Sequence, residues 1–202
     1  MTPDELLTTT RSVRRRLDLR REVPAGVIEE CLGIAIQAPC GSGVPKYHFV
    51  VVTDAGKRAA VAELYRRAFL EYRRGQPPLE PGLRESATYL AEHLHQVPVH
   101  VIPCVNGRFA DSGPAVQASR YGDIVSATWS FMLALRARGL GTAWTTIHIH
   151  YEREVAAILG IPADVTQAAL LPVAYYTGEG FKPARRVPAR ERTYWNDWGQ
   201  TR

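Results

Sequence analysis

The stretch that says most about the fold reads Arg138-Gly139-Leu140-Gly141-Thr142-Ala143-Trp144-Thr145-Thr146. It follows residues 124–137, the most apolar helical pattern of the chain, and a glycine just past a helix commonly ends it. That helix is apolar on more than one face, which is typical of a helix in the middle of a core or in a subunit interface. Glycine in the turn lets the backbone approach a flat ligand, although a lone Gly-x-Gly is more often only a helix stop.

A second turn of small residues, Ala38-Pro39-Cys40-Gly41-Ser42-Gly43, follows a helix predicted over residues 27–36 from apolar side chains spaced three and four apart. Cys40 has two interpretations: a thiol that faces a ligand, or a small side chain that fills the end of the helix. The second is favoured, because the sequence places no base or cation beside the thiol.

Arginines gather near both ends of the chain. The first cluster is Arg11-Ser12-Val13-Arg14, in which two guanidinium groups three residues apart would share a helical face and Ser12 would add a hydroxyl donor. The second cluster is Phe181-Lys182-Pro183-Ala184-Arg185-Arg186. A guanidinium group matches the geometry of a phosphate. The two clusters could therefore close on one phosphate, and the alternative is that each is a solvated charged surface.

The rest of the chain alternates short strands with helices. The expected strands span residues 48–53, 97–105 and 168–176, with an extended segment over residues 144–149. A short helix is expected to begin near residue 3, and two further helices are expected over residues 57–73 and 152–159. Pro98 and Pro103 favour either an edge position for the second strand or a strand that begins and ends at these prolines. Prolines make residues 76–82 a loop.

The composition bounds the class of protein. With 202 residues, of which 46% are hydrophobic, the chain is long enough for one domain with a sizeable core. The net charge is +5, but the chain has no stripe of basic residues with aromatic residues between them, so nucleic-acid binding is not favoured. Three widely spaced cysteines, with no apolar leader and no long apolar run, favour a cytoplasmic protein that does not enter the membrane.

Two histidine pairs, His93 with His95 and His148 with His150, have the alternate spacing that places two side chains on one side of a strand. A metal site needs further ligands, and no third ligand can be assigned. No metal is therefore expected. His148 is a candidate for orienting a substrate beside the turn at residues 139–146.

The order of these elements resembles the FMN-dependent nitroreductase family over nearly the whole chain. Residues 10–14 are similar to the family's Arg-Arg-Ser-x-Arg pattern, with Thr10 in place of its first arginine. Arg186 matches a C-terminal arginine that precedes a small apolar residue and proline. Residues 139–144 resemble the family's Gly-Leu-Gly-Thr-x-Trp stretch. The match weakens where the family has Ser, Asn, Gln and Trp, because this chain has Cys40, Gly43, Pro45 and Tyr47.

The resemblance implies which residues bind FMN. Those of the two arginine clusters would hold the phosphate, and those of the two turns would lie against the flavin. The implied cofactor-binding residues are Arg11, Ser12, Arg14, Pro39, Cys40, Gly41, Gly141, Trp144, Thr145, Thr146 and Arg186. No catalytic acid or base is implied, because the flavin carries out the redox chemistry while the protein supplies position and electrostatics.

The implied fold is α+β, with a central mixed β-sheet flanked by helices, in an intertwined homodimer whose two FMN sites are each built from both chains. Residues 1–202 would form one nitroreductase-like domain, with residues 189–202 as a C-terminal extension that packs on the partner subunit. The implied activity is the reduction of nitroaromatics, quinones or similar small-molecule acceptors by NAD(P)H in a ping-pong mechanism. Two alternatives stay open: a specialised flavin oxidase or dehydrogenase acting on a biosynthetic intermediate, and a protein that has lost FMN and binds or scaffolds a partner.

Overall fold

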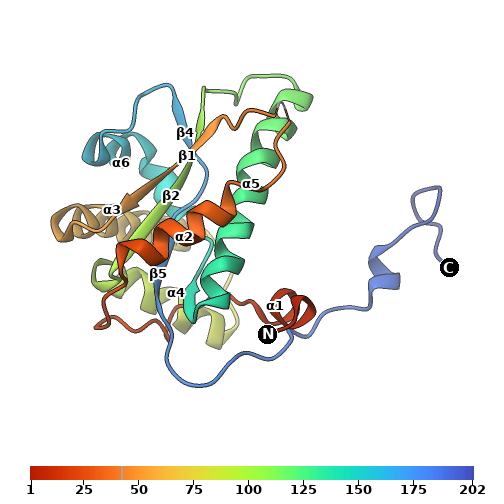
Figure 1. Cartoon of the computed structure of the whole chain (residues 1–202), viewed down its shortest axis with the longest axis horizontal. Coiled ribbons are helices and arrows are strands. Elements are labelled where there is room, and N and C mark those ends of the chain that lie inside the picture. Colours follow the sequence, from red (N-terminus) through yellow and green to blue (C-terminus); the bar gives the residue numbers. More distant parts are fainter. Residues whose placement is uncertain (42) are drawn as a thin grey trace.

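A five-stranded β-sheet runs through the middle of the molecule, with the strand order β1-β2-β5-β3 and β4 paired to β2 (Figure 1). The structure is a computed structural model that describes residues 1–41 and 43–202, so Ser42 of the second turn lies outside the described residues. The strands are β1 (Tyr47–Val52), β2 (Val99–Asn106), β3 (Leu140–Thr142), β4 (Val165–Gln167) and β5 (Leu171–Tyr175).

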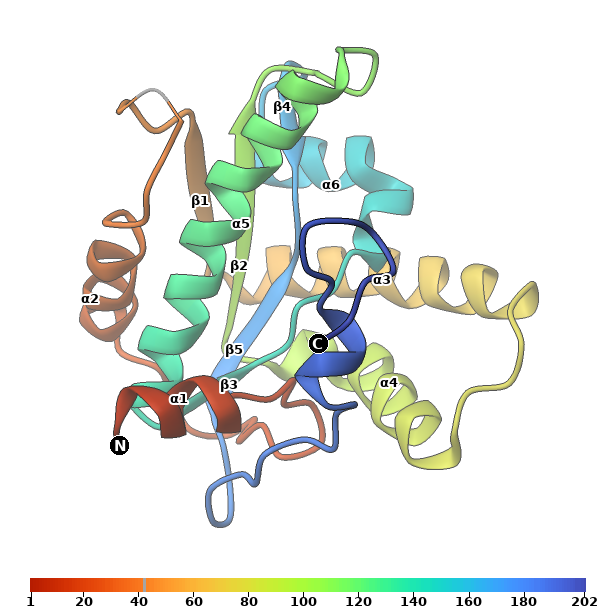
Figure 2. The ribbon, with the colours of Figure 1, turned by 90° about the vertical axis from the view of Figure 1, so that its right-hand side faces the viewer.

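Helices cover both faces of the sheet (Figure 2). On one face pack α2 (Ala25–Ala35) and α5 (Pro114–Ala137), around a core that includes Phe131 and Leu171. On the other face pack α3 (Ala55–Arg74), α4 (Pro81–His93) and α6 (Glu152–Leu159), around Tyr65 and Ile102. The shorter elements are α1 (Pro3–Thr9) and the 3-10 helices η1 (Leu94–Gln96), η2 (Ile147–Tyr151) and η3 (Ala189–Arg192). The α+β class expected from the sequence is confirmed.

Local signals mark the start of α1 and the end of α6. At the start of α1, Glu5 N donates to the Thr2 hydroxyl at 3.2 Å, and Thr2 N donates to the Glu5 carboxylate at 2.7 Å. This reciprocal pair satisfies two backbone donors at the helix start. At the end of α6, Gly160 has a φ of 70°, which only glycine adopts without cost.

β2 is the central strand of the sheet, so the predicted edge position is wrong. It pairs with β1 along one side, and along the other side with β5 at Val99–Val101 and with β4 at Cys104–Asn106. The carbonyl of Pro103 accepts a hydrogen bond from Ala168 at 2.8 Å, on the side of β5 and β4. The nitrogen of Pro103, which carries no hydrogen, therefore points to the gap between β5 and β4. No hydrogen bond of the β-ladders is lost there.

The pairing directions are uneven. The four ladders between the named strands are antiparallel. Parallel pairing is present at two isolated bridges, Ser12 with Thr142 and Gly107 with Val165. Within the described residues the expected mixture of directions is thus confined to these bridges.

Other segments differ from the sequence prediction. Residues 147–151 form η2 instead of an extended segment, and α4 begins at Pro81, inside the predicted loop. α5 begins at Pro114, well before the predicted residue 124, because its first turns carry polar side chains that hide the apolar pattern. In β1 only Tyr47 and Val52 are buried, since β1 is an edge strand. None of the helices in the described part of the chain is long and apolar enough to cross a membrane.

Gly141 in β3 is required for the packing of the N-terminal segment. A Cβ at this position would lie 2.9 Å from the Cβ of Val13 and 3.0 Å from both of its methyl groups. Val13 itself is buried, and its β-branched side chain cannot rotate away freely. The glycine therefore lets residues 11–14 lie directly against β3.

Replacing Gly141 with alanine is expected to lower the free energy of unfolding by about 1–3 kcal/mol, because overpacking forces the Val13 segment outward. Denaturant titration of the purified variant measures this change. Gly33→Ala is the matched control: nothing lies within 4 Å of a Cβ there, so the same substitution in α2 should stabilise the protein by about 0.5–1 kcal/mol. Equal effects at the two glycines would contradict the packing argument.

Two histidines are buried in the core between the sheet and α3. His100 on β2 shares a hydrogen bond of 2.9 Å with the carbonyl of Leu94. Neither ring nitrogen of His148 has a partner within residues 1–41 and 43–202. Burial lowers the pKa of His100 to about 4, and burial together with the charge of His100 lowers the pKa of His148 to about 3. Both rings are therefore neutral at neutral pH.

His148 and His150 do not share one side of a strand, because they lie in η2, where His148 is buried and His150 is exposed. Among the residues that the structure describes, no group of three or more His, Cys, Asp or Glu side chains is placed to hold a metal ion. His148 is also too deeply buried to orient a substrate, so its role is structural.

Because the pKa values of His100 and His148 are lowered, we expect the folded state to be less stable in acid. In the unfolded chain both would titrate near 6.5, so between pH 7 and pH 5 the unfolded state binds protons that the folded state does not. We expect the free energy of unfolding to fall by roughly 2 kcal/mol for each histidine over this range. Urea titrations at the two pH values measure the loss. His148→Leu should remove about half of this loss of stability. The control His95→Asn, at an exposed position, should leave the loss unchanged. A free energy of unfolding that does not depend on pH would contradict the prediction.

Candidate functional site

Residues 11–14 lie beside β3 in an extended conformation. α1 ends at Thr9, so Arg11 and Arg14 do not share a helical face, and that prediction is wrong. Instead Ser12 forms a parallel bridge with Thr142, and Val13 N donates to the Thr142 carbonyl at 2.8 Å. The bridge brings the first arginine cluster against the turn at residues 139–146.

Arg11 connects the two ends of the chain. Its Nη2 donates to the carbonyl of Thr8 at 2.6 Å and to that of Lys182 at 3.0 Å. The start of the second arginine cluster is thereby held next to the first, as the sequence predicted. The rest of that cluster is free of such contacts: Arg185 and Arg186 are exposed, with no hydrogen bond or ion pair to any described residue.

Arg14 stands near Tyr65, a residue of α3 that the sequence analysis missed. The Tyr65 hydroxyl shares a hydrogen bond of 3.0 Å with the Thr145 hydroxyl. Burial raises the pKa of Tyr65, and both this hydrogen bond and the charge of Arg14 oppose the rise. The Arg14 side chain has no hydrogen-bond or carboxylate partner in the described part of the chain, although its backbone carbonyl accepts from Leu17 N at 3.2 Å. Its guanidinium group is therefore available to a ligand.

The turn after β3 is held firmly on its inner side. Thr145 pairs with Leu170 through an antiparallel bridge, and its side chain is buried against Tyr65. Trp144 packs on the core of α2 and α5 and is partly buried. Thr146 is exposed. Of the three, Thr146 alone presents its side chain to solvent, while Thr145 orients the backbone.

A cavity of about 360 Å³ opens beside Thr146. Its walls include Phe109, whose ring meets that of Tyr121 edge to face with 4.9 Å between centroids, and Ile149. Apolar and aromatic walls with a few polar groups are typical of sites for small organic molecules. No sequence motif marked this cavity, because its walls come from four separate elements.

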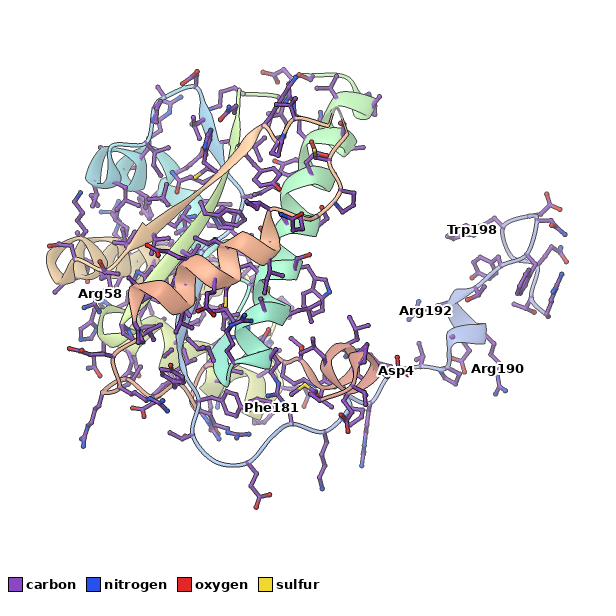
Figure 3. The ribbon with its side chains drawn as sticks, viewed as in Figure 1. Asp4, Arg58, Phe181, Arg190, Arg192 and Trp198 are labelled. Carbon is purple, nitrogen blue, oxygen red and sulfur yellow. The ribbon has the colours of Figure 1, made fainter. Side chains whose placement is uncertain are left out.

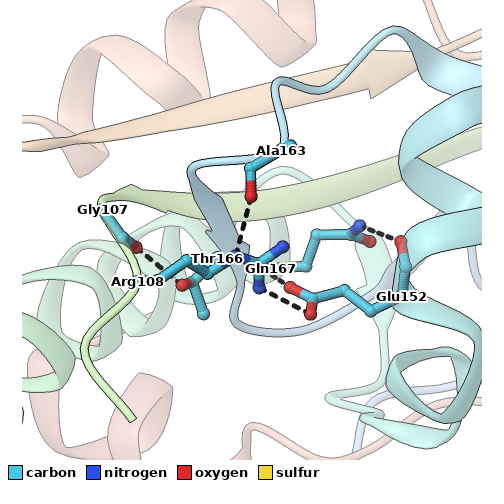
Figure 4. A network of polar contacts seen from close by, with 6 residues as sticks. All are labelled: Gly107, Arg108, Glu152, Ala163, Thr166 and Gln167. Carbon is cyan, nitrogen blue, oxygen red and sulfur yellow. Dashed lines mark hydrogen bonds and ion pairs between the residues drawn. The ribbon is translucent and has the colours of Figure 1, made fainter. Parts of the chain in front are cut away.

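An ion pair forms the polar side of this cavity (Figure 4). Arg108 donates to the Glu152 carboxylate at 2.7 Å and to the Ala163 carbonyl at 2.9 Å. The other carboxylate oxygen accepts from Gln167 N at 2.8 Å, and Gln167 Nε2 donates to the Glu152 carbonyl at 2.8 Å. Because both carboxylate oxygens accept hydrogen bonds within it, the network holds α6 against β4.

The second turn lies elsewhere in the molecule. Gly41 N donates to the carboxylate of Asp123, near the middle of α5, at 2.8 Å; Pro39 is exposed and Cys40 is partly buried. α5 rises about 1.5 Å per residue, so Asp123 is about 20 Å from the end of the helix, where β3 and residues 11–14 begin. One chain therefore does not bring Pro39, Cys40 and Gly41 together with Arg11, Ser12 and Arg14.

The donors beside β3 fit the phosphate end of FMN. Ser12 is exposed, the Arg14 guanidinium has no partner among the described residues, and Arg11 binds the carbonyl of Lys182, which precedes the C-terminal arginines in the chain. Hydroxyl and guanidinium groups are the usual protein donors to phosphate. The second turn offers backbone groups and the thiol of Cys40 in place of the polar side chains of the family pattern, which is a poorer donor set.

Comparisons with known proteins identify the family of the chain. The model of the Nitroreductase family matches residues 7–175. A protein of Thermus thermophilus described as "NADH dehydrogenase" is 29% identical over 92% of this chain and 91% of its own length.

Solved structures share the fold. One is the FMN and NADPH-dependent nitroreductase NfnB from sphigopyxis sp. strain HMH, with a TM-score of 0.73 at 22% identity, covering 98% of this chain and 100% of its own. Another is oxidized iodotyrosine deiodinase bound to FMN and 3-iodo-L-tyrosine, with a TM-score of 0.74 at 22% identity, covering 95% of this chain and 99% of its own. Since the family model spans most of the chain, including both β3 and the arginine segment docked on it, this protein belongs to the nitroreductase family.

Proposed function

We propose that the protein is an FMN-dependent oxidoreductase that takes electrons from NAD(P)H and passes them to a nitroaromatic, a quinone or a similar acceptor in a ping-pong mechanism. One observation carries the proposal: the Ser12–Thr142 bridge joins the arginine segment to the glycine turn, two motifs far apart in the sequence. The names of similar proteins, which include an NADH dehydrogenase and an FMN and NADPH-dependent nitroreductase, support it.

The residues have distinct roles in this proposal. Ser12 and Arg14 bind the phosphate, and Arg186 reaches it from the C-terminal side. The backbone of Thr145 and Thr146, held from behind by Leu170 and Tyr65, orients the ring system. When bound, FMN supplies the electron-transfer chemistry, and the protein supplies orientation and exclusion of water. The cavity beside Thr146 takes the flat acceptor.

We further propose a homodimer in which each cofactor site uses both chains. Residues 39–41 contact the middle of α5 at Asp123 and Ser126, whereas residues 11–14 lie beside β3, which follows the C-terminal end of α5. A second copy is therefore needed to bring residues 39–41 to the arginine segment. α5 also exposes Tyr121, Val125 and Trp129, four residues apart along one face, which suits a subunit interface. We assign the extension at residues 189–202 to the surface of the partner.

The extension has the character of such a contact. Its aromatic side chains Tyr194, Trp195 and Trp198 are exposed, and Figure 3 shows Arg190, Arg192 and Trp198 far from the sheet and its helices. Exposed tryptophans are enriched where proteins meet. We also propose the cytoplasm as the location, because Cys31, Cys40 and Cys104 are all free.

The test is the visible spectrum of the purified protein after incubation with FMN and desalting, followed by assays with NADH or NADPH and aromatic acceptors. Retained flavin and nicotinamide-dependent turnover are expected. Protein that retains no flavin would contradict the proposal and leave a binding role. Flavin that turns over a substrate with oxygen and no nicotinamide would point instead to an oxidase.

A further inference from the structure

The start of the C-terminal segment, residues 176–182, is held by arginines from distant parts of the chain. Arg11 reaches the carbonyl of Lys182. Arg16 Nε donates to the carbonyl of Thr177 at 2.7 Å, and its Nη2 donates to the carbonyl of Glu179. Gly178 has a φ of +75°, and a Cβ there would lie 3.2 Å from Arg16 Nη2. The guanidinium group of Arg16 is thus fitted closely into this segment.

Two guanidinium groups also lie over one pair of aromatic rings. The rings of Tyr176 and Phe181 are 4.9 Å apart between centroids. Arg16 lies 4.4 Å from the centroid of Phe181, and Arg136, at the end of α5, lies 5.1 Å from it. Arg136 also donates to the Tyr176 hydroxyl at 2.5 Å. Figure 3 shows Phe181 at the lower edge of the body, at the start of the C-terminal tail.

The charges in this cluster are not balanced by acids. Arg136 is only 6% exposed and its Nε has no partner, and within residues 1–41 and 43–202 neither Arg16 nor Arg136 forms an ion pair with a carboxylate. A buried cation is costly unless something compensates it. Here the aromatic faces, the Tyr176 hydroxyl and the backbone carbonyls do so. The two arginines and the aromatic segment therefore hold one another in place.

Holding this segment confines Arg186. Arg186 is the fourth residue after Lys182, and four steps of the chain span at most about 14 Å. Lys182 is itself in contact with Arg11, which belongs to the arginine segment beside β3. A fixed Lys182 thus keeps the side chain of Arg186 within reach of Ser12 and Arg14, whereas a loose one would let it move away with the exposed tail.

We propose that Arg16 and Arg136, acting through Tyr176 and Phe181, are positioning residues that fix the C-terminal segment so that Arg186 meets the phosphate of the flavin cofactor. The inference rests on the proposed function. The four residues do not contact the cofactor, and they act by reducing the freedom that Arg186 would lose on binding.

The test separates the phosphate from the rest of the flavin. The dissociation constants of FMN and of riboflavin, which lacks the phosphate, are measured on the full-length apoprotein by fluorescence titration. The ratio of the riboflavin constant to the FMN constant isolates the phosphate contribution. In Phe181→Ala and in Arg16→Gln this ratio should fall about tenfold, as loss of one charge-assisted contact implies, with riboflavin binding changed by less than about twofold.

Three further variants sharpen the result. Phe181→Tyr keeps an aromatic face and should keep the ratio of the native protein. Arg20→Gln removes an exposed charge from the same region of the chain and should also keep it. Arg186→Ala should lower the ratio in the native background and add nothing in the Phe181→Ala background.

Three outcomes would overturn the inference. A parallel loss of both flavins would indicate a merely structural role. An unchanged ratio in folded Phe181→Ala and Arg16→Gln, or additive effects with Arg186→Ala, would show that the cluster does not act through Arg186. If the native protein binds neither FMN nor riboflavin, both the proposed function and this inference fail. If it binds the two flavins equally, the flavin site stands, and only the assignment of a phosphate-binding role to Arg186 and its neighbours fails.

Discussion

Replacing Arg14 with methionine is expected to raise the dissociation constant of FMN by about 10- to 100-fold. A hydrogen bond to a charged group contributes about 1.5–3 kcal/mol, which corresponds to this range. Within residues 11–14, the guanidinium group of Arg14 has no partner among the described residues. Its charge is therefore available to the phosphate. Methionine keeps much of the length of the stem and removes the charge.

Arg15→Met is the matched control. Arg15 is the next residue, but its side chain turns to α4, where it forms an exposed ion pair of 2.8 Å with Glu85. Exposed pairs of this kind contribute about 0–1 kcal/mol, so FMN affinity should change by less than about threefold. Fluorescence titration of both variants decides the matter. Equal affinities in Arg14→Met and the native protein would remove Arg14 from the site.

Replacing Trp129 with glutamate is expected to dissociate the proposed homodimer and to abolish FMN retention together. Trp129 lies on the exposed face of α5 with Tyr121 and Val125. In an interface, a glutamate at its centre would bury an unpaired charge, which costs several kcal/mol. Sedimentation at fixed protomer concentration and the flavin content of the same sample measure the two effects.

Leu70→Glu is the control for surface charge. Leu70 is as exposed as Trp129 but lies on α3, which packs on the other face of the sheet. It should leave both the assembly and the flavin content unchanged. A Trp129→Glu protein that stays dimeric would exclude this face as the interface. A monomer that keeps its flavin would show that one chain completes the site.

Sequence patterns predicted the parts of the molecule that depend on neighbouring residues. The start of a helix near residue 3 and the helix over residues 152–159 follow from local hydrogen bonding and backbone preference. The chemistry of the arginine segment was also readable, because a guanidinium group has the same affinity for phosphate in any fold. The family followed from these motifs in their order.

Tertiary structure decided what depends on residues far apart in the chain. Pro103 pointed to an edge strand, and only the change from β5 to β4 beside it shows why a central strand tolerates it. The roles of Tyr65 and Arg136 depend on Thr145 and Tyr176, which no local pattern connects to them. The sequence made His148 a candidate for orienting a substrate, yet the packing of η2 buries it without a hydrogen-bond partner in the described chain.

Gly141 shows the division most clearly. The sequence suggests that this glycine lets a ligand come close to the backbone. In the fold it is the side chain of Val13 that lies against Gly141. The sequence by itself indicated the family, the start of α1, the end of α6 and the candidate donors for a phosphate, because these follow from local backbone and side-chain chemistry. The tertiary structure alone decided which donors meet, because their distances depend on how the sheet and α5 are packed and not on their spacing along the chain.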